Sequence, residues 1–318
     1  MKSITILTPI KNEADNIYDF VDQVAKIINS ESEYFFEHIF LDNCSTDNSV
    51  SILKELINSY PHIGLIQNRR DFGWTRSIFN GLSIASGDAV IIIACDFQEP
   101  PNLIHDFIRG WEEGYKVVGG IKTSSHEKGV MGLIRKAYYK LMREISNYEH
   151  LTGFIGFGLY DRETINHFKS LEELEPYFRG LPSEFGYEIK AIPYFQPPRK
   201  AGYSKLNFFR LFDLAITGIV SQSKAPIRIA TFAGIFGSVL SAAIGIFYFI
   251  LKLLYWESFE LGLAPLLIML SFAFSLQFLF FGLIGEYISK IGRDLQKRPF
   301  VIEKSRVNVP PRKPFTPS

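Results

Sequence analysis

The stretch DAVIIIACDFQEPP, residues 88–101, contains a continuous apolar run that is followed at once by the carboxylate of Asp96. An apolar run without polar alternation is typical of a strand that is buried on both faces of a sheet. The two prolines that end the stretch lack a backbone N–H and therefore stop the strand. The stretch thus predicts a buried strand that presents an acidic side chain at its carboxyl end.

The residues around this strand alternate between strand and helix patterns. Further apolar strands are predicted at 4–10, 38–42, 64–67 and 116–121, and helices at 13–29, 46–60 and 73–85. We expect Ser45 or Thr46 to cap the second of these helices. The alternation predicts an α/β fold of Rossmann-like type, in which helices cover both faces of a mostly parallel sheet.

Polar side chains lie at the carboxyl ends of three predicted strands. Ligands of such sheets bind beyond the carboxyl ends of the strands, so we expect these side chains to line one site. The candidate segments are 9–13 after the first strand, with Asn12 and Glu13, 42–47 after the second, with Asp42, and 96–99 after the fourth, with Asp96. The first strand is not followed by a G-x-G-x-x-G segment, which argues against a dinucleotide-dependent oxidoreductase.

Net charge and cysteine content argue against other classes of protein. The formal net charge is +1, which gives no overall field for binding nucleic acid. The two cysteines, Cys44 and Cys95, do not have the spacing of a secreted disulfide framework. Reduced thiols in a cytosolic compartment are the simpler interpretation.

Apolar residues make up 47% of the chain and are concentrated near the C-terminus. Residues 229–251 carry no charge and are long enough to cross a bilayer core of about 30 Å as a helix, and residues 261–285 form a second such run. Lysines and arginines precede the first run and follow the second, so the positive-inside rule predicts that both termini are cytoplasmic. We therefore predict an integral membrane protein with a two-helix transmembrane hairpin at 229–290.

The hairpin defines the other predicted boundaries. Residues 1–205 are expected to form the catalytic domain, 206–228 a juxtamembrane amphipathic segment that meets the lipid bilayer, and 291–318 a cytoplasmic tail, of which 301–318 is expected to be loose. Apolar residues at helical spacing within 130–145, flanked by basic residues, predict a helix that lies on the membrane surface or on the domain core. Small residues at four-residue steps within 229–251 favour close packing, either between the two spans or in a homo-oligomer.

Several motifs resemble, in order and spacing, those of inverting family 2 glycosyltransferases with the GT-A fold. They are TPIKNEADNI (8–17), LDNCSTDNS (41–49), NRRDFGWTRSIFNGLSIASGDAVIIIACDFQEPP (68–101), YFRGLPSEFGY (177–187) and PPRKAGYSKL (197–206). Within that family the chain looks like the polyprenyl-phosphate branch, which includes relatives of dolichol-phosphate mannose synthase and the bactoprenol-phosphate glucosyltransferases. The resemblance extends from residue 3 to about residue 290.

The resemblance implies a role for each matching position. Pro9, Asn12 and Glu13 would line the base and ribose of a nucleotide, and Asp42 would hold the base. Asp96 would be the surviving acid of a D-x-D motif that binds Mg²⁺ or Mn²⁺, with Gln98 as a second contact. The implied catalytic residues are Asp96, Gln98, Arg199 and Lys205, and those expected to meet the lipid phosphate are Ser204, Lys205, Arg210 and Arg228.

The sequence departs from the family pattern near these positions. Ala94 stands where many members have the first acid of D-x-D, and Asn43 replaces the second acid of a pair at the second strand. Asp71, Trp74 and Lys122 also differ from the residues that are frequent there. One carboxylate still suffices for Mg²⁺ when substrate phosphates and water supply the other ligands.

The activity implied by the resemblance is transfer of a sugar from a nucleotide sugar, for which we choose UDP-glucose, to polyprenyl (undecaprenyl) phosphate. The reaction would proceed with inversion at the cytoplasmic face of the bacterial inner membrane. A lipid phosphate is already an anion, so its oxygen can attack in line without a general base.

Two other hypotheses remain open from the sequence. The first is a processive polysaccharide synthase, which needs more membrane helices and usually a Q-x-x-R-W segment, neither of which occurs here. The second is a catalytically weak membrane scaffold that binds a nucleotide sugar, a role suggested by Ala94.

Overall fold

A computed structural model describes residues 1–123, 151, 153–171, 173, 176–197, 263–295 and 299–309, together with single positions between 227 and 254. The chain divides into two compact units. The first unit contains an α/β sheet domain, and the second contains the long helix α10 (Leu263–Asp294).

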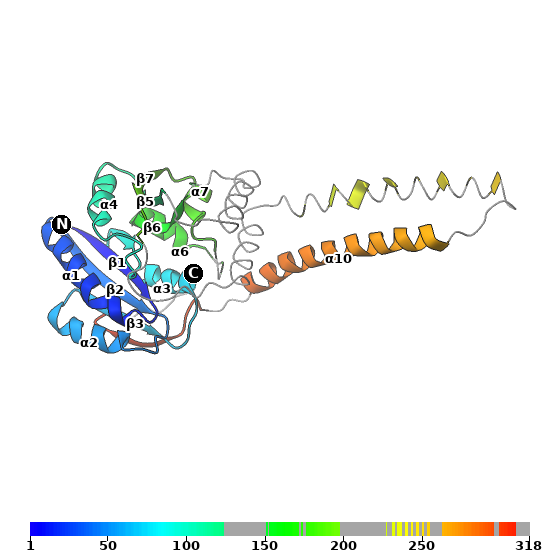
Figure 1. The fold of residues 1–318 in the computed structure, drawn as a ribbon. Coiled ribbons are helices and arrows are strands. Elements are labelled where there is room, and N and C mark those ends of the chain that lie inside the picture. Colours follow the sequence, from blue (N-terminus) through cyan, green and yellow to red (C-terminus); the bar gives the residue numbers. More distant parts are fainter. Residues whose placement is uncertain are drawn as a thin grey trace. The chain divides into compact units, whose positions relative to one another are not determined.

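The first unit is built on one eight-stranded sheet with the strand order β7-β5-β6-β4-β1-β2-β3-β8 (Figure 1). The strands are β1 (Lys2–Ile10), β2 (Tyr34–Asp42), β3 (Ile63–Asn68), β4 (Ala89–Ile92), β5 (Val117–Lys122), β6 (Phe154–Asp161), β7 (Ile189–Tyr194) and β8 (Glu303–Val307). Only β6 and β8 run antiparallel to their neighbours among these described strands. The predicted mostly parallel α/β sheet is therefore confirmed, and the carboxyl ends of the parallel strands share one edge.

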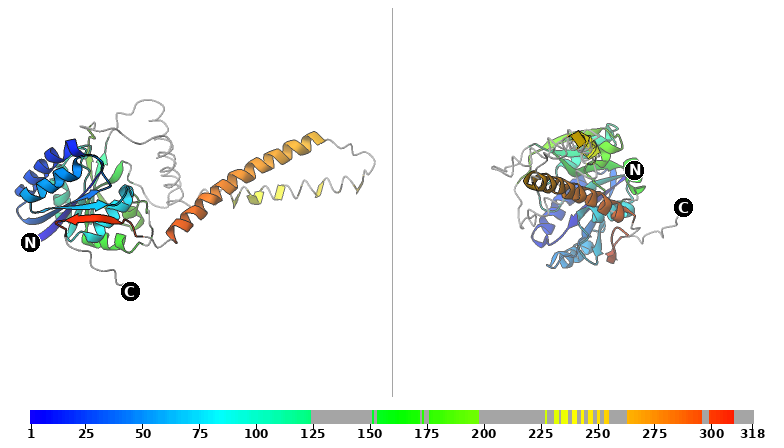
Figure 2. Two further views of the ribbon diagram at one scale, coloured as in Figure 1. Left: turned by 90° about the horizontal axis from the view of Figure 1, so that it is seen from below. Right: turned by 90° about the vertical axis from the view of Figure 1, so that its right-hand side faces the viewer.

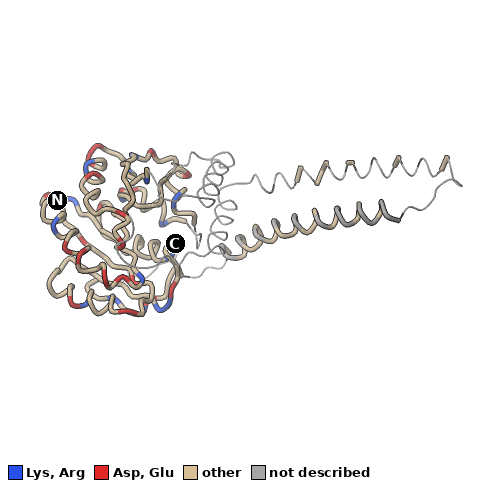
Figure 3. The backbone as a smooth tube through the Cα atoms, viewed as in Figure 1, with Lys and Arg blue, Asp and Glu red and all other residues tan. Residues whose placement is uncertain are grey.

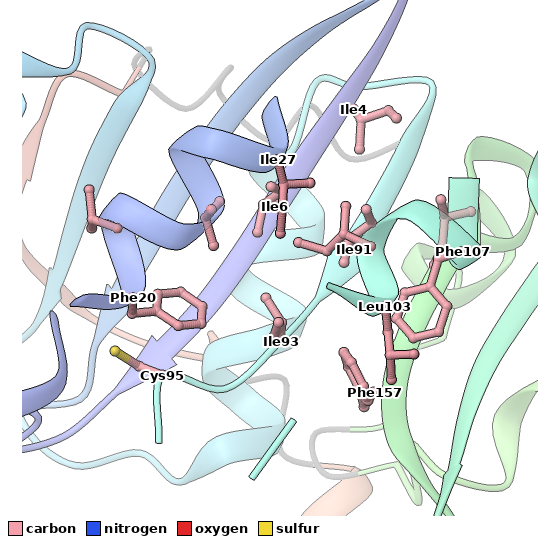
Figure 4. Packing of buried hydrophobic residues seen from close by; sticks show 14 of the residues in the cluster. Ile4, Ile6, Phe20, Ile27, Ile91, Ile93, Cys95, Leu103, Phe107 and Phe157 are labelled. Atoms are coloured by element: carbon pink, nitrogen blue, oxygen red, sulfur yellow. The ribbon is translucent and has the colours of Figure 1, made fainter. Parts of the chain in front are cut away.

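Helices cover both faces of the sheet because the strand side chains alternate between two apolar layers. Ile4 and Ile6 of β1 face one layer, and Leu7 faces the other. The first layer is closed by α1 (Ala14–Ser30), α2 (Ser49–Ser59) and α4 (Leu103–Glu112), and Figure 4 shows its side chains. The second layer is closed by α3 (Trp74–Ile84), α6 (Arg162–Lys169) and α7 (Leu181–Glu184).

The predicted cap of the second helix is wrong. The N-cap position of α2 is Asn48, whose side chain forms no capping hydrogen bond. Ser45 and Thr46 lie upstream of it and form hydrogen bonds to the loop after β1, as described below.

The prediction of a loose tail is also wrong for residues 303–307. They form β8, which runs antiparallel along β3 at the edge of the sheet (Figure 2). Side chains fix this strand: Phe300 stacks on Phe79 with ring centroids 5.3 Å apart, and Asn80 Nδ2 donates to Glu303 Oε1 at 2.8 Å. The contacts that hold this segment in place come from residues more than two hundred positions away, so the sequence of the tail alone does not reveal them.

The predicted transmembrane hairpin is not supported by the part of the chain that the structure describes, where no helix is both long and apolar enough to cross a membrane. The predicted amphipathic helix within 130–145 and the juxtamembrane segment up to residue 226 lie outside the described residues.

Acidic and basic residues are interspersed along the described helices and loops of the first unit (Figure 3). This distribution agrees with the net charge of +1.

Candidate functional site

Hydrogen bonds tie the loop after β1 to the loop after β2. Asn12 has a φ of 58°, a left-handed conformation that Asn tolerates better than most residues. Its backbone N–H donates to Ser45 Oγ at 2.9 Å, and its Oδ1 accepts from the backbone N–H of Thr46 at 2.8 Å. The N–H of Glu13 donates to Ser49 Oγ, also at 2.9 Å. Two of the strand ends that the sequence singles out are thus joined in one rigid frame.

Asp42 lies at the end of β2 inside this frame. Its side chain is 2% exposed, and its Oδ1 accepts a hydrogen bond from the backbone N–H of Ser45 at 3.0 Å. In the register of the sheet Asp42 is paired with Ile10, at the end of β1 and one position after Pro9. The structure therefore brings Pro9, Asn12 and Asp42 to the same edge of the sheet.

Asn43 extends the frame to the loop after β3. Its Oδ1 accepts from Asn68 Nδ2 at 3.2 Å and from the backbone N–H of Phe72 at 3.0 Å. The same Asn68 amide donates to Ser77 Oγ at 3.0 Å, within α3. Asn43, which stands where the family pattern has an acid, thus still provides an oxygen acceptor. This oxygen holds the β3–α3 loop against the end of β2.

Two other departures, Asp71 and Trp74, lie in the loop between β3 and α3 and at the start of α3. Lys11 forms an ion pair with Asp71, and Asp71 Oδ1 accepts from the backbone N–H of Gly73 at 3.0 Å. Trp74 begins α3, and its ring meets Phe178 edge-on at a centroid distance of 5.3 Å. The loop is therefore held at one end by the loop after β1 and at the other by the YFRGLPSEFGY segment.

Asp96 lies in a tight turn after β4. Its side chain is 8% exposed, and its Oδ1 accepts from the backbone N–H of Gln98 at 3.2 Å. Phe97 between them has a φ of 58°, a conformation that is strained for a bulky residue. The turn closes through Glu99, whose Oε2 accepts from the backbone N–H of Ala94 at 2.6 Å.

The groups in this turn are shielded from solvent and lie near several carboxyl groups, and both effects shift their pKa values. Burial, together with the charge of Asp96, raises the pKa of Glu99 to about 8, although the hydrogen bond from the Ala94 N–H and the charge of Arg179 oppose the rise. Burial also raises the pKa of the Cys95 thiol, with smaller effects of Glu13 and Asp96. The charges of Glu13 and Asp96 both act on Cys95, which places the ends of β1 and β4 beside each other.

The sequence does not single out Tyr194 or Arg179. Tyr194 ends β7, and burial raises the pKa of its hydroxyl together with the charges of Glu99 and Asp96. Both residues therefore lie within electrostatic range of the acidic turn. An aromatic residue at the end of a strand was the available signal for Tyr194, but recognising it requires knowing that β7 is parallel to β5.

The remaining predicted site residues are Arg199, Ser204, Lys205, Arg210 and Arg228, all of which lie outside the described residues. Their assignment to phosphate binding stays a prediction. A cluster of three or more His, Cys, Asp or Glu side chains that could hold a metal ion does not occur in the described part of the chain.

The α/β sheet and the polar carboxyl edge together are of the GT-A type, as the sequence predicts. The model of the family described as "Glycosyl transferase family 2" matches residues 5–174, and the chain belongs to that family. It is therefore a glycosyltransferase.

Curated relatives match almost the whole chain. The SfII prophage-derived bactoprenol glucosyl transferase of Shigella flexneri is 32% identical over 306 residues, which cover 95% of this chain and 98% of that protein. The uncharacterized glycosyltransferase YkcC of Bacillus subtilis is 30% identical over 308 residues, which cover 95% and 93%. A solved structure, glucosyl-3-phosphoglycerate synthase of Mycobacterium tuberculosis with Mn²⁺, UDP and phosphoglyceric acid, is 18% identical, with a TM-score of 0.48 over 69% of this chain and 77% of that one.

Proposed function

We propose that the protein transfers glucose from UDP-glucose to a polyprenyl phosphate, with inversion, and releases a polyprenyl-phosphate sugar. The observation that carries this proposal is the similarity of 32% over nearly the full length to a bactoprenol glucosyl transferase. A bactoprenol acceptor and a glucose donor are what that relative's name describes.

The nucleotide part of the donor would bind at the joined ends of β1 and β2. Asn12 and Asp42 lie there in a frame whose hydrogen bonds are already made, so donor binding requires little ordering of the backbone. Pro9 and Glu13 flank them, in the roles that the family pattern implies.

A divalent cation, Mg²⁺ or Mn²⁺, would be held by Asp96 and Gln98. Their carboxylate and amide oxygens are of the ligand type that these cations prefer, and Asp96 is largely buried at the edge of the sheet. The donor diphosphate and water would complete the coordination, since the described residues contain no group of three or more His, Cys, Asp or Glu side chains that could hold a metal ion. When bound, the cation would neutralise the charge that develops on the leaving diphosphate.

The acceptor makes a separate general base unnecessary. A phosphate monoester carries negative charge at neutral pH, so its oxygen can attack the anomeric carbon directly as the bond to the diphosphate breaks. The protein's part is then to orient both substrates and to stabilise charge. Arg199 and Lys205 are proposed to contribute positive charge, and Ser204, Arg210 and Arg228 to meet the acceptor phosphate.

The lipid acceptor requires contact with a membrane, which we assign to residues 229–290. The described side chains of α10 include Phe278, Phe281 and Ile288, which are 69%, 57% and 62% exposed. Such a row of exposed apolar side chains is typical of a membrane or protein contact.

The purified full-length protein, incubated with labelled UDP-glucose, undecaprenyl phosphate and Mg²⁺ or Mn²⁺, tests the proposal. A labelled product that extracts into organic solvent and carries one sugar is expected. A high-molecular-weight polymer would indicate a processive synthase instead. Failure to form glycolipid with any of a panel of nucleotide sugars, despite nucleotide binding, would indicate a scaffold.

A further inference from the structure

The hydroxyl of Tyr194 is buried and lacks a hydrogen-bond partner among the residues that the structure describes. The residue as a whole is 5% exposed, so the group is also removed from bulk water. Leaving a buried hydroxyl unpaired costs roughly 1–3 kcal/mol, and native proteins seldom tolerate such a group without a reason.

The rest of the Tyr194 residue is held firmly. Its backbone carbonyl accepts from both the backbone N–H and the Oγ1 of Thr123, each at 3.0 Å. Its ring meets Phe157 edge-on at a centroid distance of 5.5 Å. The rings of Phe157 and Tyr194 also pack so closely on Gly120 that they leave no room for a side chain there. Any movement of the ring that would bring the hydroxyl to another hydrogen-bond partner would therefore disrupt this packing.

The position of the hydroxyl relative to the acidic turn gives it a chemical context. Tyr194 ends a strand that is parallel to β5, so it lies at the same edge of the sheet as Asp42 and the turn of Asp96. Among the causes that raise the pKa of Tyr194 are the negative charges of Glu99 and Asp96, which shows that both carboxyl groups are near.

We propose that Tyr194 is a donor-binding residue, whose hydroxyl donates a hydrogen bond to an oxygen of the sugar diphosphate when the nucleotide sugar is bound. This inference rests on the proposed function and adds a residue to its site. The bound ligand would supply the acceptor that the described residues do not provide, so the hydroxyl would be paired in the complex. The candidate oxygens are those of the sugar ring and of the diphosphate, and both are hydrogen-bond acceptors.

The substitution Tyr194→Phe removes the hydroxyl and leaves the ring. If the hydroxyl is unpaired in the free protein, the thermal stability of Tyr194→Phe without ligand equals or exceeds that of the wild type. Its affinity for UDP-glucose, measured by calorimetry on the full-length protein with Mg²⁺ and without acceptor, is expected to fall about tenfold. Titration with UDP separates the two sources of oxygen: a loss toward UDP-glucose alone assigns the sugar, and an equal loss toward UDP assigns the diphosphate.

Tyr160→Phe is the matched control. Tyr160 is a fully buried tyrosine of β6 whose hydroxyl does have a partner, since it donates to the carbonyl of Gly156 at 2.9 Å. Tyr160→Phe is therefore expected to lower thermal stability and to leave the Kd for UDP-glucose unchanged. The two variants should show opposite patterns of stability and binding.

Two results would overturn the assignment of Tyr194. One is an unchanged Kd for UDP-glucose in Tyr194→Phe. The other is a loss of stability similar to that of Tyr160→Phe, which would mean that the hydroxyl has an internal partner. If the wild type binds neither UDP-glucose nor any other nucleotide sugar, the proposed function fails as well. If the wild type and Tyr194→Phe bind UDP-glucose with the same Kd, only the assignment of Tyr194 fails.

Discussion

Glu99 accepts a hydrogen bond from the backbone N–H of Ala94, with 2.6 Å between Ala94 N and Glu99 Oε2. Ala94 occupies the position where the family pattern usually has an acid, and the side chain of Glu99, further along the chain, folds back onto its backbone. The bond spans Asp96 and Gln98, which lie between its two ends. Glu99 therefore determines the shape of the turn that presents the predicted metal ligands.

Removal of this bond should loosen the turn. In Glu99→Ala the partly buried N–H of Ala94 loses its acceptor, so we expect the free energy of unfolding to fall by about 1–3 kcal/mol and turnover to fall with it. Glu99→Gln retains an oxygen acceptor and should recover most of both. Chemical denaturation and initial rates of glycolipid formation measure the two effects. Equal losses in both variants would mean that the carboxylate acts by some means other than the Ala94 bond.

Asp96 is the only acid of the turn in the proposed metal-binding position. Asp96→Asn keeps the size of the side chain and removes its charge, so we expect turnover to fall about 100-fold or more and the required concentration of Mg²⁺ or Mn²⁺ to rise. Initial rates over a metal titration measure both quantities. Asp106→Asn, an exposed residue in the first turn of α4, is the control and should behave as the wild type. Near-normal turnover in Asp96→Asn would refute the metal assignment.

The central strands and their helices could be predicted because each is marked by the pattern of apolar residues within its own segment. Residues 89–92 are apolar without interruption and form β4, and residues 14–30 have the apolar spacing of one helix face and form α1. A continuous apolar run such as that of β4 is typical of a parallel strand that is buried on both faces of the sheet. The polar strand ends could be found for the same reason, since the edge to which Asp42 and Asp96 belong follows from a parallel sheet.

The remaining features depend on partners that are distant in the sequence. Strand β8 is short and charged, and it is stabilised by β3 and by Asn80, which is 223 residues away from Glu303. Tyr194 ends a strand with mostly partial burial, so its pattern does not mark it as part of a site. Its relation to Asp96 depends on the strand order β7-β5-β6-β4, which no local pattern reveals.

The edge strand β8 should be essential for the stability of the first unit. Glu303 accepts from Asn80, which is 2% exposed, and pairs with Arg306, so Glu303→Ala removes the acceptor of a buried amide and one ion pair of Arg306. We expect a loss of about 1–3 kcal/mol in the free energy of unfolding. Glu113→Ala is the control, because Glu113 is 55% exposed and its ion pair with Lys190 should contribute under about 1 kcal/mol. Equal losses in the two variants would contradict the role of β8.

His38 should make the stability of the first unit depend on pH. It is 1% exposed beside Phe40, its Nε2 shares a hydrogen bond with Thr8 Oγ1 at 2.9 Å, and its Nδ1 is without a partner among the described residues. Burial, followed by the charge of His62, lowers the pKa of His38 to about 3, whereas the pKa of an unfolded histidine is about 6.5. The neutral ring is thus preferred in the folded state. Its contribution to stability is fully present above pH 6.5 and is lost as the pH falls toward 3.

The double variant Thr8→Val/His38→Phe isolates this effect, because it replaces both members of the hydrogen bond by apolar groups of similar shape. Between pH 7 and pH 4 the wild type should lose roughly 3 kcal/mol more stability than the double variant, since each unit of pKa difference is worth about 1.4 kcal/mol. Urea denaturation across this pH range measures the difference, and the carboxylates common to both proteins cancel. Parallel pH profiles would show that another group, and not His38, governs unfolding in acid.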